Sequence, residues 1–177
     1  MRRNICVIMA FIIVFLFVSL PRSLAQQTVM RQERVVYNLP YPGLLPDHPL
    51  YFLKAIRDRF LDISTRDYSK KAELYLLLSD KRVAMALSLA DEGKDNLAIS
   101  TLSKAEKYFL KIPPLLQTSK KQGVTATAEL VDRLKLSNAK HHMVASELLK
   151  KLPQGRGGEI KEIIDMNAQI KTQLQKL

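Results

Sequence analysis

Two neighbouring stretches, residues 69–92 and 95–112, repeat apolar side chains at spacings of three and four, with Gly93 between them. The repeating positions of the first stretch are Ala72, Leu76, Ser79, Val83, Ala86 and Ala90, and those of the second are Ala98, Leu102, Ala105, Phe109 and Ile112. This spacing places the side chains on one face of an α-helix, and the small residues among them allow two helices to approach closely. Because the connection through Gly93 is short, we expect an antiparallel helical hairpin at the centre of an all-α fold.

A first helix is predicted directly before this hairpin, over residues 49–64. We expect Asp47 or His48 to cap it, and Pro49 suits its first turn, because the N–H groups there have no partner within the helix. The apolar residues that recur at helical spacing in this segment are Leu50, Leu53, Ile56 and Phe60.

The second half of the chain contains two more predicted helices. Pro113-Pro114 is expected to stop the helix that begins near Asp95, and a polar linker containing Gly123 then leads to a helix over residues 125–152. Residues 153–158 break the chain again before a last helix that reaches the C-terminus. Residues 49–177 are therefore predicted to form a bundle of about five helices.

A proline-rich segment precedes the helical domain. Residues 26–48 form a polar arm followed by a strap that contains Pro40, Pro42 and Pro46. Proline fixes φ and moves the preceding residue out of the helical region, so the strap should be stiff and extended. We expect it to pack over the hairpin, with Tyr51 sealing the contact; the alternative is that its aromatic and proline residues bind a partner.

The N-terminus has the pattern of a secretory signal peptide over residues 1–25. Arg2 and Arg3 precede an apolar run at residues 5–20, and Ser23 and Ala25 are the small residues that a signal peptidase prefers. Cleavage after Ala25 is the preferred interpretation, and an uncleaved N-terminal membrane anchor is the alternative; in both, the domain is exported. Cys6, the only cysteine, lies inside the apolar run, so the remaining chain must be stable without a disulfide.

The basic charge of the chain points to acidic partners. The formal net charge is +11, and removing residues 1–25 takes away three arginines and no acid, which leaves +8. Such a surface favours anionic lipid head groups or envelope polymers, although basic residues scattered along helices also serve as an ordinary solvated surface. Export and the absence of basic stretches interleaved with aromatic residues argue against intracellular nucleic acid.

No catalytic, cofactor or metal motif is present in the sequence. Gly155, Gly157 and Gly158 precede a helix, but no strand leads into them, so they are interpreted as a flexible linker and not as an anion cradle. His141 falls on the apolar face of its predicted helix and His142 points away from it; neither has a carboxylate or histidine at the spacing that a shared metal site needs. We therefore expect His141 to be a hydrogen-bonded core residue.

A pair of acidic residues lies on the first predicted helix. Asp58 and Asp62 are four residues apart and have Arg57, Arg59 and Arg66 near them, so a surface charge network is expected there rather than acid–base catalysis.

The last helix carries one asparagine among its repeating apolar positions, which are Ile160, Ile163, Asn167, Ile170, Leu174 and Leu177. A polar residue in such a seam fixes register in coiled coils, so self-association through this helix is one interpretation. The preferred one is that the helix docks on its own domain, with Asn167 at the margin of the contact, because the repeat is short for a coiled coil.

The block Pro49-Leu50-Tyr51-Phe52-Leu53-Lys54, which follows the strap and precedes the helix over residues 69–92, resembles an uncharacterised bacterial domain family. That family opens with a Pro-Leu-Tyr-x-x-Lys motif and occurs in exported or membrane-anchored proteins. The resemblance covers residues 39–112 and implies an exported, all-α protein without known catalytic residues.

These observations predict an exported, non-catalytic helical protein of the cell envelope, without cofactor. The preferred function is a structural or protein-binding module whose partner is an exported or membrane protein, or a second copy of the chain. The alternative is an anion-binding protein that uses its basic surface on phospholipid or envelope polymers.

Overall fold

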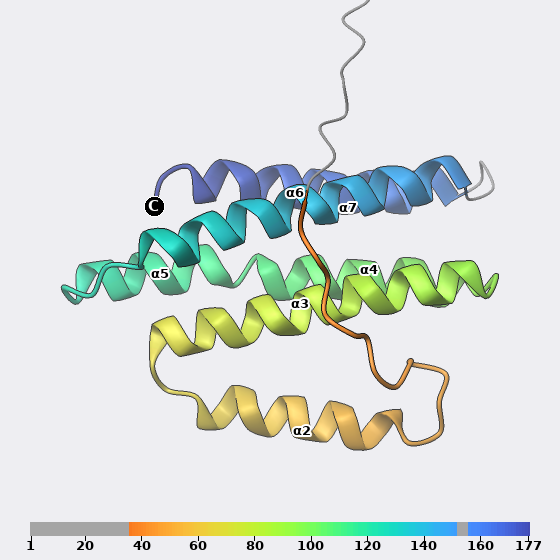
Figure 1. The fold of residues 1–177 in the computed structure, drawn as a ribbon, viewed down its shortest axis with the longest axis horizontal. Helices are drawn as coiled ribbons and strands as arrows, with labels where there is room; N and C mark the ends of the chain where they lie inside the picture. Colours follow the sequence, from red (N-terminus) through yellow and green to blue (C-terminus); the bar gives the residue numbers. More distant parts are fainter. Residues whose placement is uncertain (1–35, 152–155) are drawn as a thin grey trace, which may run out of the picture. The chain divides into compact units, whose positions relative to one another are not determined.

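The computed structural model describes residues 36–151 and 156–177, and the only regular secondary structure in these ranges is helical (Figure 1). The prediction of an all-α fold is confirmed. The helices are α2 (Tyr51–Ser64), α3 (Tyr68–Asp91), α4 (Asp95–Phe109), α5 (Ile112–Lys121), α6 (Ala128–Lys151) and α7 (Gly157–Leu174). The predicted signal peptide and the beginning of the arm lie outside the described residues.

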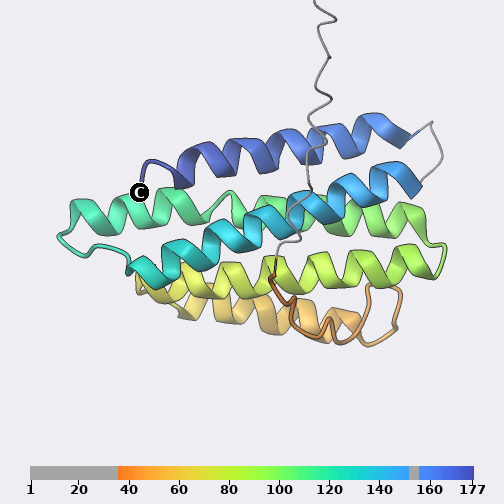
Figure 2. The same ribbon diagram turned by 45° about the horizontal axis from the view of Figure 1, so that its top comes forward.

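The predicted hairpin is formed by α3 and α4, which pack against each other along their length (Figure 2). All of the repeating positions on these two helices are buried, apart from Ala90, which is partly buried. Gly93 has a φ of 71°, a left-handed conformation that ends α3 and that side chains other than glycine rarely adopt. The helix α3 is central, because α2, α4, α5 and α6 all pack against it.

The segment after α4 differs from the prediction. The chain bends at Leu110 and Lys111, and Pro113 and Pro114 then lie in the first turn of α5 rather than in a linker. A proline there removes no helical hydrogen bond, because the first N–H groups of a helix have no partner within it. Ile112 and Leu116 of α5 are buried in the core, so burial of apolar surface supports a sixth helix in the described ranges.

The start of α2 is also shifted from its predicted position. The helix begins at Tyr51, and the backbone N–H of Leu50 donates to Nδ1 of His48 at 3.1 Å. Pro49 therefore lies before the helix and not in its first turn. Asp47 does not cap the helix, because it forms an ion pair with Lys94 at the turn between α3 and α4.

The core of the bundle is divided into two clusters of buried residues. The first cluster lies toward α5 and includes Leu76, Phe109, Leu134 and Ile170; the second includes Val83, Leu102, Val144 and Ile163. Each of the four helices α3, α4, α6 and α7 contributes to both clusters. Between the two clusters, the buried residues of these helices are polar except for Leu78, and Asp80, Glu106, His141 and Asn167 among them form a polar layer.

The predictions for the last two helices are confirmed in outline. On α6, the side chains that recur at spacings of three and four are all buried, and α7 packs along α6 and α4. These positions of α6 are Leu130, Leu134, Ser137, His141, Val144 and Leu148. The C-terminal helix is thus docked on its own domain, with Leu177 only partly buried. In the described part of the chain, no helix combines the length and hydropathy required to cross a membrane.

The described part of the arm and strap, residues 36–48, packs on the bundle and is called the strap from here on. Leu39 contacts the second core cluster, and the side chain of Tyr37 reaches α3. At the other end of the strap, Nζ of Lys54 on α2 donates to the carbonyl oxygens of Pro42 at 2.6 Å and of Leu44 at 3.2 Å. The same ammonium lies 5.9 Å from the centre of the partly buried Tyr51 ring, so Lys54 links the strap to α2 beside this ring.

Candidate functional site

A layer of polar side chains crosses the middle of the bundle between the two core clusters. Asp80 of α3, Glu106 of α4, His141 of α6 and Asn167 of α7 all belong to it and are at most 3% exposed. On each helix the polar residue lies between members of the two clusters, for example Asp80 between Leu76 and Val83. The layer is thus built by four helices at one level of the bundle.

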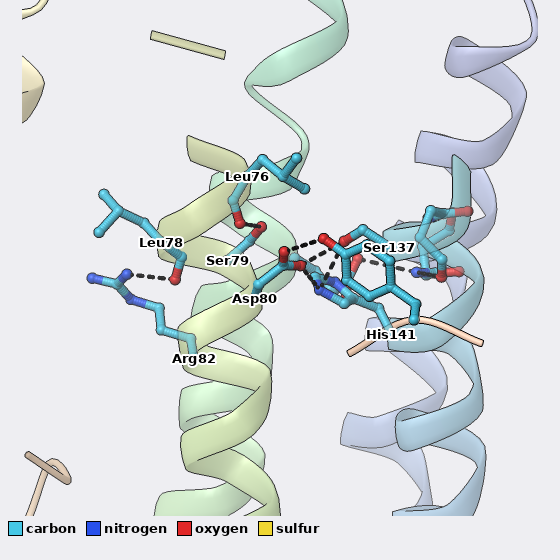
Figure 3. A network of polar contacts seen from close by, with 11 residues as sticks. Leu76, Leu78, Ser79, Asp80, Arg82, Ser137 and His141 are labelled. Atoms are coloured by element: carbon cyan, nitrogen blue, oxygen red, sulfur yellow. Dashed lines mark hydrogen bonds and ion pairs between the residues drawn. The ribbon is translucent and has the colours of Figure 1, made fainter. Parts of the chain in front are cut away.

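His141 is the centre of this layer (Figure 3). Its Nε2 lies 2.9 Å from Oδ1 of Asp80, and its Nδ1 lies 2.9 Å from Oε1 of Glu106. Complete burial lowers the pKa of the ring, but the two carboxylates outweigh burial and raise the pKa from 6.5 to about 9. The imidazole is therefore protonated at neutral pH and donates from both nitrogens, as a cation between two anions.

Asp80 accepts two further hydrogen bonds. The hydroxyl of Ser137 on α6 donates to Oδ1 at 2.6 Å, and the phenol of Tyr37 in the strap donates to Oδ2 at 2.6 Å. Burial and the adjacent Asp80 raise the pKa of Tyr37 well above its usual value, so its hydroxyl stays a donor. The strap thereby reaches the same carboxylate that holds His141.

The other side of the layer is closed by amides. Nδ2 of Asn138 donates to the backbone oxygen of Asn167 at 3.1 Å, and Nδ2 of Asn167 donates to the backbone oxygen of Asn138 at 3.0 Å. Nδ2 of Asn167 also lies 3.4 Å from Oε2 of Glu106. Asn167 is 2% exposed, so the prediction that it lies at the margin of the contact is wrong.

The geometry of the layer is that of a structural element. Both ring nitrogens of His141 are occupied by carboxylates, and all of the side chains around the ring are buried. Within residues 36–151 and 156–177, no group of three or more histidine, cysteine, aspartate or glutamate side chains is arranged to hold a metal ion.

The second notable region is α2, which turns its acidic side chains toward the bundle and its apolar side chains toward solvent, the reverse of the usual arrangement of an amphipathic helix. Asp58 and Asp62 are 2% and 8% exposed and face α3, so the prediction of a surface charge network is wrong. The carboxylate of Asp58 pairs with Arg57 at 2.7 Å and with Arg82 of α3 at 3.3 Å. Figure 3 shows Arg82 and Asp80 on opposite sides of α3, so this helix carries polar contacts in both directions.

Asp62 is held by α3 in a similar way. The phenol of Tyr75 donates to Oδ1 of Asp62 at 2.6 Å, and Nζ of Lys71 lies 3.4 Å from the same oxygen. Burial raises the pKa of Asp62, but the bond from Tyr75 and the charge of Lys71 outweigh it and lower the pKa. Arg59, which lies 3.6 Å from Oδ2, completes the set of partners.

The opposite face of α2 consists of exposed apolar side chains. Between 53% and 69% of the surface of each is exposed, and they are Phe52, Leu53, Ile56, Phe60 and Ile63. We call these five residues the α2 apolar face. Figure 1 shows α2 beyond α3 at the edge of the bundle, opposite the edge formed by α6 and α7. Exposed apolar residues arranged along one helix face mark interaction sites more often than isolated ones do.

A hollow lined by basic residues adjoins this face. Its walls are strap residues 41–44 together with Leu53, Lys54, Arg57 and Lys81. No carboxylate is among these lining residues. Burial lowers the pKa of Lys54 to about 8, and its ammonium is held by the strap carbonyls.

A family model for a domain of unknown function, DUF5667, matches residues 43–155. The chain belongs to this family. The DUF5667 match begins in the strap and includes α2, α3, α4, α5 and α6, while α7 follows it. The apolar face of α2 and most of the polar layer are thus part of the DUF5667 domain. No curated protein and no solved structure matches the chain.

The structure places the remaining sequence-predicted residues of this DUF5667 protein as follows. His141 is a hydrogen-bonded core residue as predicted, and His142 is exposed. Gly157 and Gly158 are not linker residues, because α7 begins at Gly157, while Gly155 lies outside the described residues. Asp80 and Glu106 were not predicted from the sequence. The one feature that could have pointed to them is that each follows directly on a buried repeating position of its hairpin helix.

Proposed function

We propose that this DUF5667 protein is an exported, non-catalytic binding module that contacts its partner through the α2 apolar face. The supporting observation is the orientation of α2, which keeps both of its carboxylates against α3 and leaves five apolar side chains in solvent. Exposing such a face is unfavourable in water, and a contact that covers it recovers the free energy of burying the apolar surface.

The orientation of α2 is fixed by strong partners. Rotating the helix to bury its apolar face would expose or strand the charges of Asp58 and Arg82, which are both buried. Separating a buried ion pair is costly, because one charge is then left without a partner. The outward position of the apolar residues is therefore a stable property of the fold.

The arrangement of the polar layer supports a non-catalytic role. Its histidine is fully buried and paired with Asp80 and Glu106, and its hydrogen bonds join four helices and the strap. A satisfied network of this kind rigidifies a core and specifies its packing. We propose that it serves to hold α3, and thereby the surface on which α2 is mounted.

A cross-linking experiment tests the proposal in the native cells. A photoreactive phenylalanine derivative replaces Phe52 in one variant and Leu136 of α6, which is 46% exposed, in a matched control. We expect a defined cross-linked species from position 52 and none from position 136. Equal or absent cross-linking at the two positions overturns α2 as the binding surface. Protection of the domain from protease added to cells whose wall and any outer membrane have been removed overturns export.

The second candidate function is the binding of anions, which the basic hollow beside the strap favours. Arg57 and Lys81 approach it without a carboxylate among the lining residues. Binding through this hollow should weaken steeply as salt is raised, whereas binding through the apolar face alone should not. A salt titration of the retained partner separates the two.

A further inference from the structure

We propose that the α2 apolar face binds the surface of an anionic lipid bilayer, with α2 lying in the plane of the interface. This inference rests on the proposed function and names the partner of the same face. It joins the two candidate functions, because the apolar residues and the basic residues belong to one continuous surface: Leu53 belongs to the face and also lines the basic hollow.

The positions of the arginines on α2 carry the argument. At about 100° per residue, the five apolar side chains occupy an arc of about 100°, and Arg59 and Arg57 follow on its two sides. The side chains of these arginines are 74% and 54% exposed. Helices that lie in a membrane interface have this arrangement, since the apolar face enters the acyl region while basic side chains extend to the head groups.

The surface is cationic even after its ion pairs are counted. Asp58 is shared by Arg57 and Arg82, and Asp62 is shared by Arg59 and Lys71, so each buried carboxylate faces two basic side chains. Both carboxylates are buried, and α2 exposes no acidic side chain. Together with Lys81 at the hollow, this charge complements anionic head groups.

A second copy of the chain fits this surface poorly. A two-fold contact places the same patch of both copies face to face. The arginines that border the apolar face would then lie against their own equivalents, with no exposed carboxylate on α2 to balance them. Like charges brought together at the rim of an interface oppose association.

The composition of the face favours lipid over an acidic protein. Its five side chains are phenylalanine, leucine and isoleucine, which have no polar atom to fix the direction of a partner. Protein interfaces carry about one hydrogen bond per 100–200 Å², and these five side chains offer no donor or acceptor for one. A helix at the edge of the bundle, with an outward hydrocarbon face, needs from its partner only an apolar layer below a negative one (Figure 1).

The test uses the absence of tryptophan from the chain. The full chain carrying Phe60→Trp is added to vesicles of phosphatidylcholine and phosphatidylglycerol whose acyl chains are brominated, and Leu136→Trp on α6 is the matched control. Because the leader is the same in both, only the local position of the probe differs. We expect a blue shift and strong bromine quenching at position 60 and little change at position 136.

A second pair of variants checks that the face itself makes the contact. Ile56→Ser in the Phe60→Trp chain should restore most of the quenched emission, while Leu77→Ser, at an exposed position of α3, should not. Vesicles of phosphatidylcholine alone should quench position 60 much less. Circular dichroism confirms that all four chains are folded.

Several outcomes overturn the inference. Equal quenching at positions 60 and 136, or quenching that is as strong without phosphatidylglycerol, contradicts an anionic lipid partner for this face. A blue shift at position 60 before vesicles are added shows that another occupant covers it: the leader if the shift is independent of protein concentration, a second copy if it is not. If lipid contact fails while Phe52 still cross-links to a protein in cells, the proposed function stands and the lipid inference falls.

Discussion

Asn138 and Asn167 exchange side-chain hydrogen bonds, each donating from Nδ2 to the backbone oxygen of the other at 3.1 and 3.0 Å. This reciprocal pair joins α6 to α7 at the level of the polar layer, where both residues are at most 3% exposed. An apolar side chain could fill the same space, but its contacts would not require a particular alignment of the two helices. The amides fix which turn of α7 meets which turn of α6, and they bring Nδ2 of Asn167 toward Glu106.

A double-mutant cycle measures this pair. Asn167→Ala and Asn138→Ala should each lower the free energy of unfolding by about 0.5 to 1.5 kcal/mol, because each removes a buried hydrogen bond to a backbone oxygen of the other helix. The double variant should cost less than the sum, with a coupling energy of about 1 kcal/mol. Gln169→Ala, an exposed change on α7, is the control in urea unfolding. Additive costs would mean that the two amides do not act as a pair.

The seams of the bundle could be predicted because periodicity is local information. Ala98, Leu102 and Phe109 are spaced by the geometry of their own helix, and all are buried as expected. The polar layer could not be predicted in this way, because its hydrogen bonds join residues that are far apart in the sequence. His141 is 35 residues from Glu106 and 61 from Asp80. In the sequence Asp80 is followed by Lys81 and Arg82, and three consecutive charged residues are typical of the solvent-exposed face of a helix.

The reversal of α2 shows a second limit of local patterns. Spacing divides this helix into an apolar face and an acidic face, but it does not say which one meets the core. Arg82, Lys71 and Tyr75 of α3 decide it, because they provide partners for Asp58 and Asp62. The predicted stop at Pro113-Pro114 failed for a related reason, since the pair permits a new helix and the buried Leu116 supports one.

The protonated His141 gives stability a characteristic pH dependence. Its pKa is raised from 6.5 to about 9 in the folded protein, so the folded state holds the proton more tightly than the unfolded chain. The stabilisation is complete below pH 6.5 and is lost as the pH rises through about 9. At about 1.36 kcal/mol per pH unit, the loss amounts to about 3 kcal/mol.

Urea unfolding at a series of pH values checks this dependence. Lys54, whose pKa is lowered to about 8 by burial, acts in the opposite direction between that value and 10.5, so the clearest window is pH 6.5 to 8. His142→Asn should keep the decline in this window and His141→Asn should remove it. If His141→Asn does not fold, a proton NMR titration of His141 in the wild-type protein measures its pKa directly. An apparent pKa near 6.5 would contradict a protonated His141 at neutral pH.

The docking of the strap on the bundle should depend on the phenol of Tyr37. Tyr37→Phe removes the hydrogen bond to Asp80 and leaves the rest of the ring in place. Because the acceptor is a carboxylate, we expect a loss of about 1.5 to 3 kcal/mol in the free energy of unfolding and faster proteolysis of the strap. Tyr41→Phe, at a side chain that is 84% exposed, is the matched control. Equal proteolysis of the two variants would show that Tyr37 does not hold the strap.

The reversed orientation of α2 predicts that a buried acid outweighs an exposed aromatic residue in stability. Asp58→Ala leaves Arg82, which is 6% exposed, without its carboxylate partner on α2, and should lower the free energy of unfolding by about 3 to 5 kcal/mol. Phe60→Ser changes a side chain that is 69% exposed and should stay within about 0.5 kcal/mol of the wild type. Thermal and urea unfolding of the two variants without lipid compares them directly. A larger loss from Phe60→Ser would mean that the apolar face is already covered within the chain or by a second copy, because only a buried phenylalanine contributes that much to folding.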